Sequence, residues 1–506
     1  MACGRSQRKF SLSLCAGMTS VSPERRSPEI DKRPNRRIWL LIAVGALLLA
    51  FSFSTRIRGD GVAYYGYLPA VIVDGSLDLH PVFSKFVTAG VPVYTGTVGT
   101  VLPNGMTADF KPVGAALLAL PFYLVIRVVV LALSLITGKP GPDPSVGSTY
   151  QLAFTLASLF YLLIALSLIH RFVRRHWGST SAWYAIVAVL FATPLAAYTF
   201  IDPSYSHTYS VFTITAFALV LHQTSEQRRW MVWVLLGVLA ALIVLVHYQE
   251  GLFILLMPAE GIWLISRRRW SLGELAGYAV SFGTFAICLL PQVVVNRVLF
   301  DRWLPAAAPD ISFDFSHPRV IDLLFSTHHG WIAWSPMVVI AIAGLPMAVR
   351  KLGWFAVSLI VIGLLDVFFN ASLSDWYGGS AFGARRLTDQ TLLLALGFAA
   401  SFDWLAQRRS AFGAPLLTAL GVAWTILLMA RFYYIPGVDG GLPWNGFVSG
   451  AFDGIRYVPR LFVQGTVVRD LAALDFGPAG ATALALGVTV GLAVGASRLA
   501  ARRLRI

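Results

Sequence analysis

The sequence predicts an all-α fold, a polytopic integral membrane protein with about twelve transmembrane helices. Hydrophobic residues make up 57% of the 506 residues and charged residues only 13%, whereas a soluble protein carries roughly a quarter charged residues. Apolar runs of 18 or more residues recur, for example TYQLAFTLASLFYLLIALSLIH at 149–170. Lys and Arg gather in short connectors between these runs, which is an orientation signal of membrane proteins. This distribution argues against nucleic acid as the partner of a chain with net charge +15.

Thirteen apolar runs are candidates for membrane helices. They cover residues 38–55, 113–136, 149–170, 181–200, 204–222, 230–247, 251–266, 272–295, 330–349, 352–371, 389–405, 412–431 and 478–497. The domain prediction is a disordered basic tail at 1–37, a transmembrane catalytic domain at 38–497 and a basic tail at 498–506. Both tails are expected in the cytoplasm.

The charge of the connectors sets the expected topology. The two tails and the short basic connectors carry 25 Lys and Arg, and all of them face the cytoplasm only if the run 113–136 does not cross. Pro121 and Arg127 favour a break in that run, so an interfacial helix is expected there. Twelve spans remain. The long connectors 56–148, 296–329, 372–388 and 432–477 then lie outside, and loops of this length are usually functional.

The first of these loops begins RIRGDGVAYYGYLPAVIVDGSLDLHP, at 56–81, and its first acidic residue is Asp60. Asp60 follows the first span by about five residues, at the depth of lipid headgroups. Partial desolvation there raises the pKa of a carboxyl toward that of a useful general base. A solvated helix cap in an Asp-Gly turn is the alternative.

The same loop holds further polar and aromatic candidates. Tyr64 and Tyr65 are candidates for substrate binding, and an interfacial aromatic belt that includes Tyr67 is the alternative. A second acidic residue of the site is expected in this loop. The candidates are Asp78, Asp74 and Asp109.

Basic residues in the outer loops are candidates for binding phosphate. Arg385 and Arg386 lie in DWYGGSAFGARRLTD, at 375–389, and arginine is suited to bidentate phosphate recognition. Lys111 is a further candidate. The alternative is that these side chains meet anionic lipid headgroups. His207 and Glu250, at helix ends, either contact substrate or satisfy nearby backbone groups.

Several of these segments together resemble the polytopic GT-C glycosyltransferases. The first helix is followed by an acidic residue, then Tyr-Tyr and a D-G-x-x-D-L segment. NGMTADFKPVGAALLALPFYL, at 104–124, resembles the first extracytoplasmic loop of that family, in which an apolar segment runs along the interface. IDPSYSHTYS, at 201–210, and the segment 375–389 resemble stretches of bacterial relatives. The resemblance covers most of the chain, with loose motifs.

The resemblance implies a GT-C-like fold with a long first extracytoplasmic loop containing interfacial helices. It implies sugar transfer from a polyprenyl-phosphate donor to a hydroxyl of a glycan, lipid or protein acceptor, on the outer face of a bacterial cytoplasmic membrane. Asp60 matches the position of the general base. The second acidic residue stays ambiguous, and so does the metal requirement, with a divalent metal among the alternatives and no cofactor certain.

The residues fit this chemistry on physical grounds as well. Nucleotide sugars are not available outside the cytoplasm, so an activated sugar has to arrive on a lipid, and its phosphate gains from fixed positive charge as it leaves. A transporter or flippase is the main alternative, but the two halves show no repeat of the kind common in carriers. An O-antigen ligase or polymerase type of enzyme is another alternative, and a structural scaffold is a third.

Overall fold

The computed structural model describes residues 52–91, 100–226, 228–306, 308, 311–408, 410, 412–437 and 441–465. Within these residues the regular structure is helical, and strand-like pairing is confined to two isolated bridges, Val101 with Thr107 and Phe313 with Leu373. Most of the predicted span 38–55, all of 478–497 and both tails lie outside the described residues. The count of twelve spans and the cytoplasmic placement of both termini therefore stay predictions.

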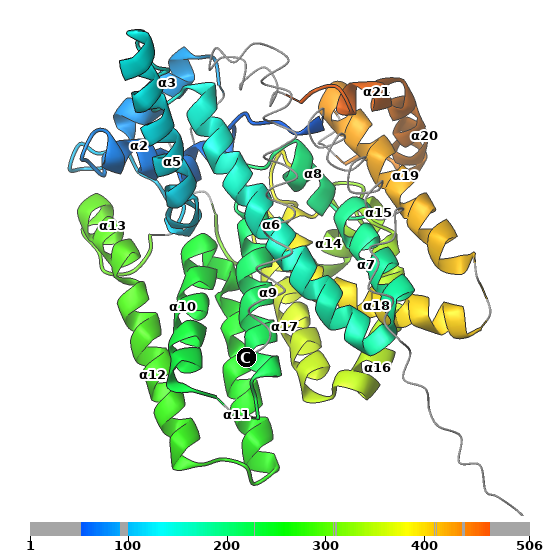
Figure 1. Ribbon diagram of the computed structural model, residues 1–506. Coiled ribbons are helices and arrows are strands. Elements are labelled where there is room, and N and C mark those ends of the chain that lie inside the picture. Colours follow the sequence, from blue (N-terminus) through cyan, green and yellow to red (C-terminus); the bar gives the residue numbers. More distant parts are fainter. Residues whose placement is uncertain are drawn as a thin grey trace, which may run out of the picture. The chain divides into compact units, whose positions relative to one another are not determined.

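Most helices follow one another with short connections (Figure 1). The helices are α2 (Asp60–Ile72), α3 (His80–Thr88), α5 (Gly114–Thr137), α6 (Ser148–Trp177), α7 (Ser179–Phe191), α8 (Leu195–Phe200), α9 (His207–Gln223), α10 (Trp230–Val246), η1 (Tyr248–Leu255), α11 (Leu256–Ser266), α12 (Leu272–Cys288), α13 (Leu290–Phe300), α14 (Val320–Phe325), α15 (Trp331–Trp334), α16 (Met337–Leu352), α17 (Trp354–Ala371), η2 (Arg385–Gln390), α18 (Thr391–Gln407), α19 (Gly413–Tyr434), α20 (Trp444–Asp453), η3 (Gly454–Tyr457) and α21 (Val458–Leu461). Longer connections separate α3 from α5, α13 from α14 and α17 from η2.

The predicted membrane class is confirmed. Among the described residues, five helical segments are long and apolar enough to cross a bilayer: Gly114–Thr137, Ser148–Trp177, Leu272–Phe300, Trp354–Ala371 and Gly413–Tyr434. Large apolar side chains stand exposed on these segments, for example Leu135 at 86% and Ile136 at 80%. Exposed apolar side chains on helices with internally satisfied backbones are what a hydrocarbon solvent requires.

The predicted break at Pro121 is wrong. α5 runs unbroken through Pro121 and Arg127 over 24 residues. A proline removes a single helical hydrogen bond, and helices in apolar surroundings tolerate that loss when neighbouring groups compensate for it. By length and composition α5 qualifies to cross the membrane, so the interfacial placement of 113–136 rests on the charge of the connectors alone.

Other predicted runs are interrupted near prolines or by tighter helical turns. The run 181–200 divides into α7 and α8 at Pro194, and the run 272–295 divides into α12 and α13 at Leu289, with Pro291 in the first turn of α13. The run 251–266 begins with the 3₁₀ segment η1, and another 3₁₀ segment, η2, precedes α18. Such segments are often functional hinges or sites of strain.

α18 lies at the centre of the main apolar core. Its residues from Thr391 to Phe402 are all buried, and it packs against α16 and α7 (Figure 1). Close approach depends on glycine, because a Cβ at Gly344 of α16 would lie 1.9 Å from the carbonyl oxygen of Gly397. Small residues at crossings are typical of membrane helices.

The tyrosines that follow Asp60 do not form an interfacial belt. Tyr64, Tyr65 and Tyr67 are 2%, 0% and 3% exposed and belong to a second apolar cluster between α2, α3, α5 and α6. α2 therefore packs inside the protein, and its first residue is held against neighbouring segments. This position determines the geometry of the site.

Candidate functional site

Asp60 is the first residue of α2, and the glycines on either side of it allow a close approach to the segment before α9. Gly59 has φ 56°, in the region that favours glycine, and a Cβ there would lie 2.5 Å from the Tyr205 hydroxyl oxygen. A Cβ at Gly61 would lie 2.1 Å from Ser204 Oγ. The Gly-Asp-Gly sequence thus seats the carboxylate directly on residues 204–205.

Two cations share one oxygen of this carboxylate. Lys111 Nζ and Arg385 Nη1 each donate to Asp60 Oδ2 over 3.1 Å. Lys111 comes from the loop before α5, and Arg385 opens η2, so residues 325 positions apart meet here. The three side chains are only 15–22% exposed, which strengthens the ion pairs relative to surface ones.

The pKa of Asp60 reflects two opposing influences. Burial, the larger single influence, raises the pKa, but the charges of Lys111 and Arg385 together hold it well below its usual range. Asp60 is therefore ionised at any physiological pH. The prediction that desolvation raises this pKa toward that of a useful base is wrong for this arrangement, because it did not include the two cations.

A cavity of about 540 Å³ opens beside this carboxylate. Its charged lining is Asp60 with Lys111, Arg385 and Arg386. Arg386 is paired with Asp375, so Lys111 and Arg385 face Asp60 with an excess of one positive charge, and the cavity favours an anion. Another part of the wall is apolar and includes Leu252, Phe313, Phe369 and Leu373. One cavity thus offers a cationic region and an apolar region to the same ligand.

The structure brings six of the predicted site residues to this cavity. They are Asp60, Tyr64, Lys111, His207, Arg385 and Arg386. The two arginines are held differently. Arg385 stacks over the Tyr205 ring at 5.6 Å, while Arg386 donates to the Asp375 side chain over 2.5 Å and to its carbonyl over 2.8 Å. Arg386 is therefore fixed by its own loop, and Arg385 by its partners in the site.

Of the three second acidic candidates, Asp109 lies beside this ion-pair arrangement. Its Oδ1 accepts from the backbone amide of Lys111 over 2.8 Å, and burial raises its pKa to about 7. It is 2% exposed and does not line the cavity. Asp78 Oδ1 accepts hydrogen bonds from the backbone amides of His80 and Thr107, so Asp78 has a structural role. Asp74 is exposed to solvent.

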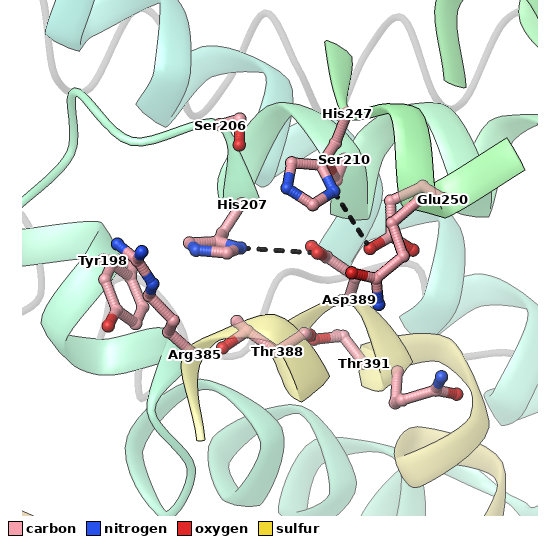
Figure 2. Close-up of polar contacts among 12 residues, drawn as sticks. Tyr198, Ser206, His207, Ser210, His247, Glu250, Arg385, Thr388, Asp389 and Thr391 are labelled. Atoms are coloured by element: carbon pink, nitrogen blue, oxygen red, sulfur yellow. Dashed lines mark hydrogen bonds and ion pairs between the residues drawn. The ribbon is translucent and has the colours of Figure 1, made fainter. Parts of the chain in front are cut away.

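Two predicted substrate contacts lie away from the cavity surface. The Tyr65 hydroxyl donates to the Pro144 carbonyl over 3.0 Å, and its ring packs on Phe86 and Phe154. Glu250 is 1% exposed and lies behind the wall, beside His247 and Asp389 (Figure 2). Neither side chain lines the cavity, so neither reaches a ligand there.

The chain is similar to ArnT from Cupriavidus metallidurans. The likeness is to the crystal structure in the apo state (TM-score 0.45, 12% identity, covering 91% of this chain and 77% of that one) and to the structure bound to undecaprenyl phosphate (TM-score 0.46, 15% identity, 91% and 76%). No protein-family model matches the sequence, and neither does any curated protein. Identity this low assigns no role to any side chain of the cavity.

Sequence reasoning missed a hydrogen-bonded group next to the site, the brace formed by Arg58, Asp202 and Tyr433. Arg58 Nε donates to Asp202 Oδ1 over 2.6 Å, and the Tyr433 hydroxyl donates to Asp202 Oδ2 over 2.5 Å. The brace holds the segment that carries Tyr205 and ties it to the end of α19, where the outer loop 432–477 was expected to begin. The available signal was the acidic residue in IDPSYSHTYS, an uncommon charge beside an apolar run.

Proposed function

We propose that this protein is a membrane glycosyltransferase that moves a sugar from a polyprenyl-phosphate donor to an acceptor hydroxyl on the extracytoplasmic face. The observation that carries the proposal is the Asp60 carboxylate held between Lys111 and Arg385 at the wall of a cationic, partly apolar cavity. This arrangement supports the proposal because a carboxylate suited to a base and two cations suited to phosphate lie within hydrogen-bond distance of each other.

The donor fits the two regions of the cavity. Its phosphate pairs with the cationic region, where Lys111, Arg385 and Arg386 offer charge-assisted hydrogen bonds. The adjoining part of the prenyl chain lies along the apolar side chains of the wall. These cations also stabilise the phosphate that leaves the anomeric carbon, because charge develops on its bridging oxygen during transfer.

The same contacts explain how a strongly ionised carboxylate becomes a base. A bound phosphate competes with Asp60 for Lys111 and Arg385. Once both cations turn to the phosphate, burial is the dominant influence left, and the pKa of Asp60 rises. The acceptor oxygen then attacks the anomeric carbon, its proton passes to Asp60, and the electron pair of the sugar–phosphate bond leaves with the polyprenyl phosphate.

The test is a transfer assay in lipid with purified wild type and Asp60→Asn, offering polyprenyl-phosphate sugars and measuring release of polyprenyl phosphate. General-base catalysis contributes about 10²- to 10⁴-fold, so Asp60→Asn should lose at least that factor while retaining donor binding. Asp74→Asn, a change at an exposed carboxylate of the same loop, is the matched control and should keep full activity.

Full activity in Asp60→Asn would refute the assignment of the base. Absence of release with any donor, together with substrate-dependent flux across proteoliposomes, would contradict the glycosyltransferase function and support the transporter alternative.

A further inference from the structure

A second polar cluster extends from the cavity wall into the interior, where the end of α10 meets η2. It consists of His247, which caps α10, Glu250 of η1 and Asp389 of η2. One ligand atom from each of them lies within 4.8 Å of the other two. Figure 2 shows the three side chains converging, with His207 reaching Asp389 from the opposite side.

Burial makes this cluster unusual. Glu250 and Asp389 are each 1% exposed, and neither oxygen of Glu250 has a hydrogen bond to any of the residues that the structure describes. The same holds for Asp389 Oδ1 and for His247 Nδ1, which lies 3.5 Å from Glu250 Oε1. Buried polar groups are nearly always satisfied, and two adjacent ionised carboxylates without a cation are strongly disfavoured.

A neighbouring carboxylate provides the contrast. Asp366 is as buried as Glu250, yet it accepts hydrogen bonds from Gln249, Gln390 and Asn370 at 2.5–2.9 Å. Asp366 is thus surrounded by hydrogen-bond donors, whereas Glu250 faces the His247 imidazole and the Asp389 carboxyl group. Glu250 and Asp389 therefore need either a shared proton or a bound cation between them.

We propose that His247, Glu250 and Asp389 bind a divalent transition-metal ion of the Mn²⁺ or Zn²⁺ class. One imidazole and two carboxylates form a nitrogen–oxygen ligand set suited to such ions, and two carboxylates balance the charge of the ion. Atoms bound at about 2.1 Å to one ion lie at most ~4.2 Å apart, so side-chain adjustments of about half an ångström close the set.

The surroundings fit a metal ligand set in another respect. His207 Nδ1 lies 3.3 Å from Asp389 Oδ2, which therefore has a hydrogen-bond partner, unlike Asp389 Oδ1. A hydrogen bond from an outer residue to a ligating carboxylate orients it toward the ion. The His-x-x-Glu spacing, at 247 and 250, brings two ligands from adjoining turns, and Asp389 adds a third from a distant segment.

The ion would have a positioning role. Asp389 lies four residues after Arg385 on η2, so an ion held at Asp389 ties the segment that carries Arg385 to the end of α10. His247 also lines the cavity, which places the metal cluster in the cavity wall. The inference does not depend on which reaction the cavity performs, because metal content and stability report it directly.

The competing arrangement is a proton shared by the two acids. Burial and the neighbouring Asp389 raise the pKa of Glu250 well above its usual range, so a protonated Glu250 is the state expected when no cation binds. The two arrangements differ in metal content and in their response to Glu250→Gln, which removes a metal ligand in one and replaces an already neutral side chain in the other.

The test uses the full-length protein in lipid nanodiscs, stripped with a chelator and reloaded with Mn²⁺ or Zn²⁺. We expect about one tightly bound ion per chain by elemental analysis, a thermal midpoint raised by the metal, and imidazole-nitrogen coupling in the electron spin echo of bound Mn²⁺. Glu250→Gln and Asp389→Asn should bind at least tenfold more weakly and lose the thermal shift. Asp74→Asn, the same chemical change at an exposed acid of the first loop, should keep both.

Three results would overturn the proposal. They are a wild-type protein that binds neither ion at micromolar concentration, a Glu250→Gln variant with wild-type affinity, and bound Mn²⁺ without nitrogen coupling. The first and third concern the wild type alone, so they remain decisive if a variant fails to fold. Wild type without bound metal and a Glu250→Gln variant of equal or greater stability would establish the shared proton instead.

Discussion

Replacement of Arg385 by methionine removes one of the two cations on Asp60 and keeps a side chain of similar length. In the wild type, Arg385 Nη1 lies 3.1 Å from Asp60 Oδ2. Two unit charges at that distance attract by ~5 kcal/mol at an effective dielectric constant of ~20. Most of this attraction offsets the desolvation of both groups. A hydrogen bond from a charged group to the donor phosphate has a net value of about 1.5–3 kcal/mol, which corresponds to roughly 10- to 150-fold in affinity.

The assay measures initial transfer rates against donor concentration for wild type and Arg385→Met. We expect the KM for the donor to rise at least tenfold, and kcat to fall because the leaving phosphate loses a partner. Arg319→Met, at an arginine whose side chain is 63% exposed, is the control. If Arg385 only met lipid headgroups, the donor KM would stay within twofold of wild type and the rate would instead vary with the fraction of anionic lipid. That result would refute the phosphate role.

Three further predictions concern neighbouring groups. Asp109 keeps its proton to about pH 7 in the folded protein, against 3.8 as its ordinary value, so its contribution to stability is lost as pH rises through that window. Asp109→Asn should remove this fall in a titration of thermal midpoints, and an unchanged profile would refute the assignment. Arg228→Met removes the cation and two hydrogen bonds of 2.6 and 2.7 Å from the buried Glu260, which keeps the hydrogen bond from the Tyr278 hydroxyl. It should lower the unfolding free energy by about 3–5 kcal/mol, and Glu260→Gln in the same chain should recover most of this loss. A loss below about 1 kcal/mol in denaturant unfolding would contradict the prediction. Gly61→Ala places a Cβ 2.1 Å from Ser204 Oγ, so it should lower the unfolding free energy by about 1–3 kcal/mol and slow transfer. Adding Ser204→Gly should restore both stability and rate, and a double variant without recovery would show that this clash is not the cause.

The membrane class and most helix positions could be predicted from the sequence because apolar length is a local property. The predicted run 149–170 corresponds to α6, and the predicted run 352–371 corresponds to α17. Interruptions were harder to place. Pro194 and Pro291 interrupt or bend their runs, whereas Pro121 leaves α5 continuous. The identity of the residue alone does not decide the outcome, since neighbouring segments determine whether the lost hydrogen bond is compensated.

The members of the site were individually visible in the sequence as charges beside apolar runs, but their relations were not. Asp60, Lys111 and Arg385 lie on three separate segments, and only packing brings both cations to one oxygen. The direction of the pKa shift of Asp60 depends on that meeting. Tyr65 shows the converse case, because an aromatic residue beside a membrane helix has the same local pattern in a belt and in a core.

η2 links the two polar centres of the protein. Arg385, at its start, donates to Asp60, and Asp389, four residues later, lies 3.3 Å from His207. His207 lines the same cavity as Arg385, and it opens α9 directly after the segment that packs on Asp60. The position of Arg385 is therefore set from both ends of η2: by the carboxylate that it neutralises and by the buried acids near α10. A change at Asp389 should thus alter the donor KM without touching the donor, and so should a change at Asp366, which accepts a hydrogen bond from Gln390 at the other end of η2 over 2.5 Å.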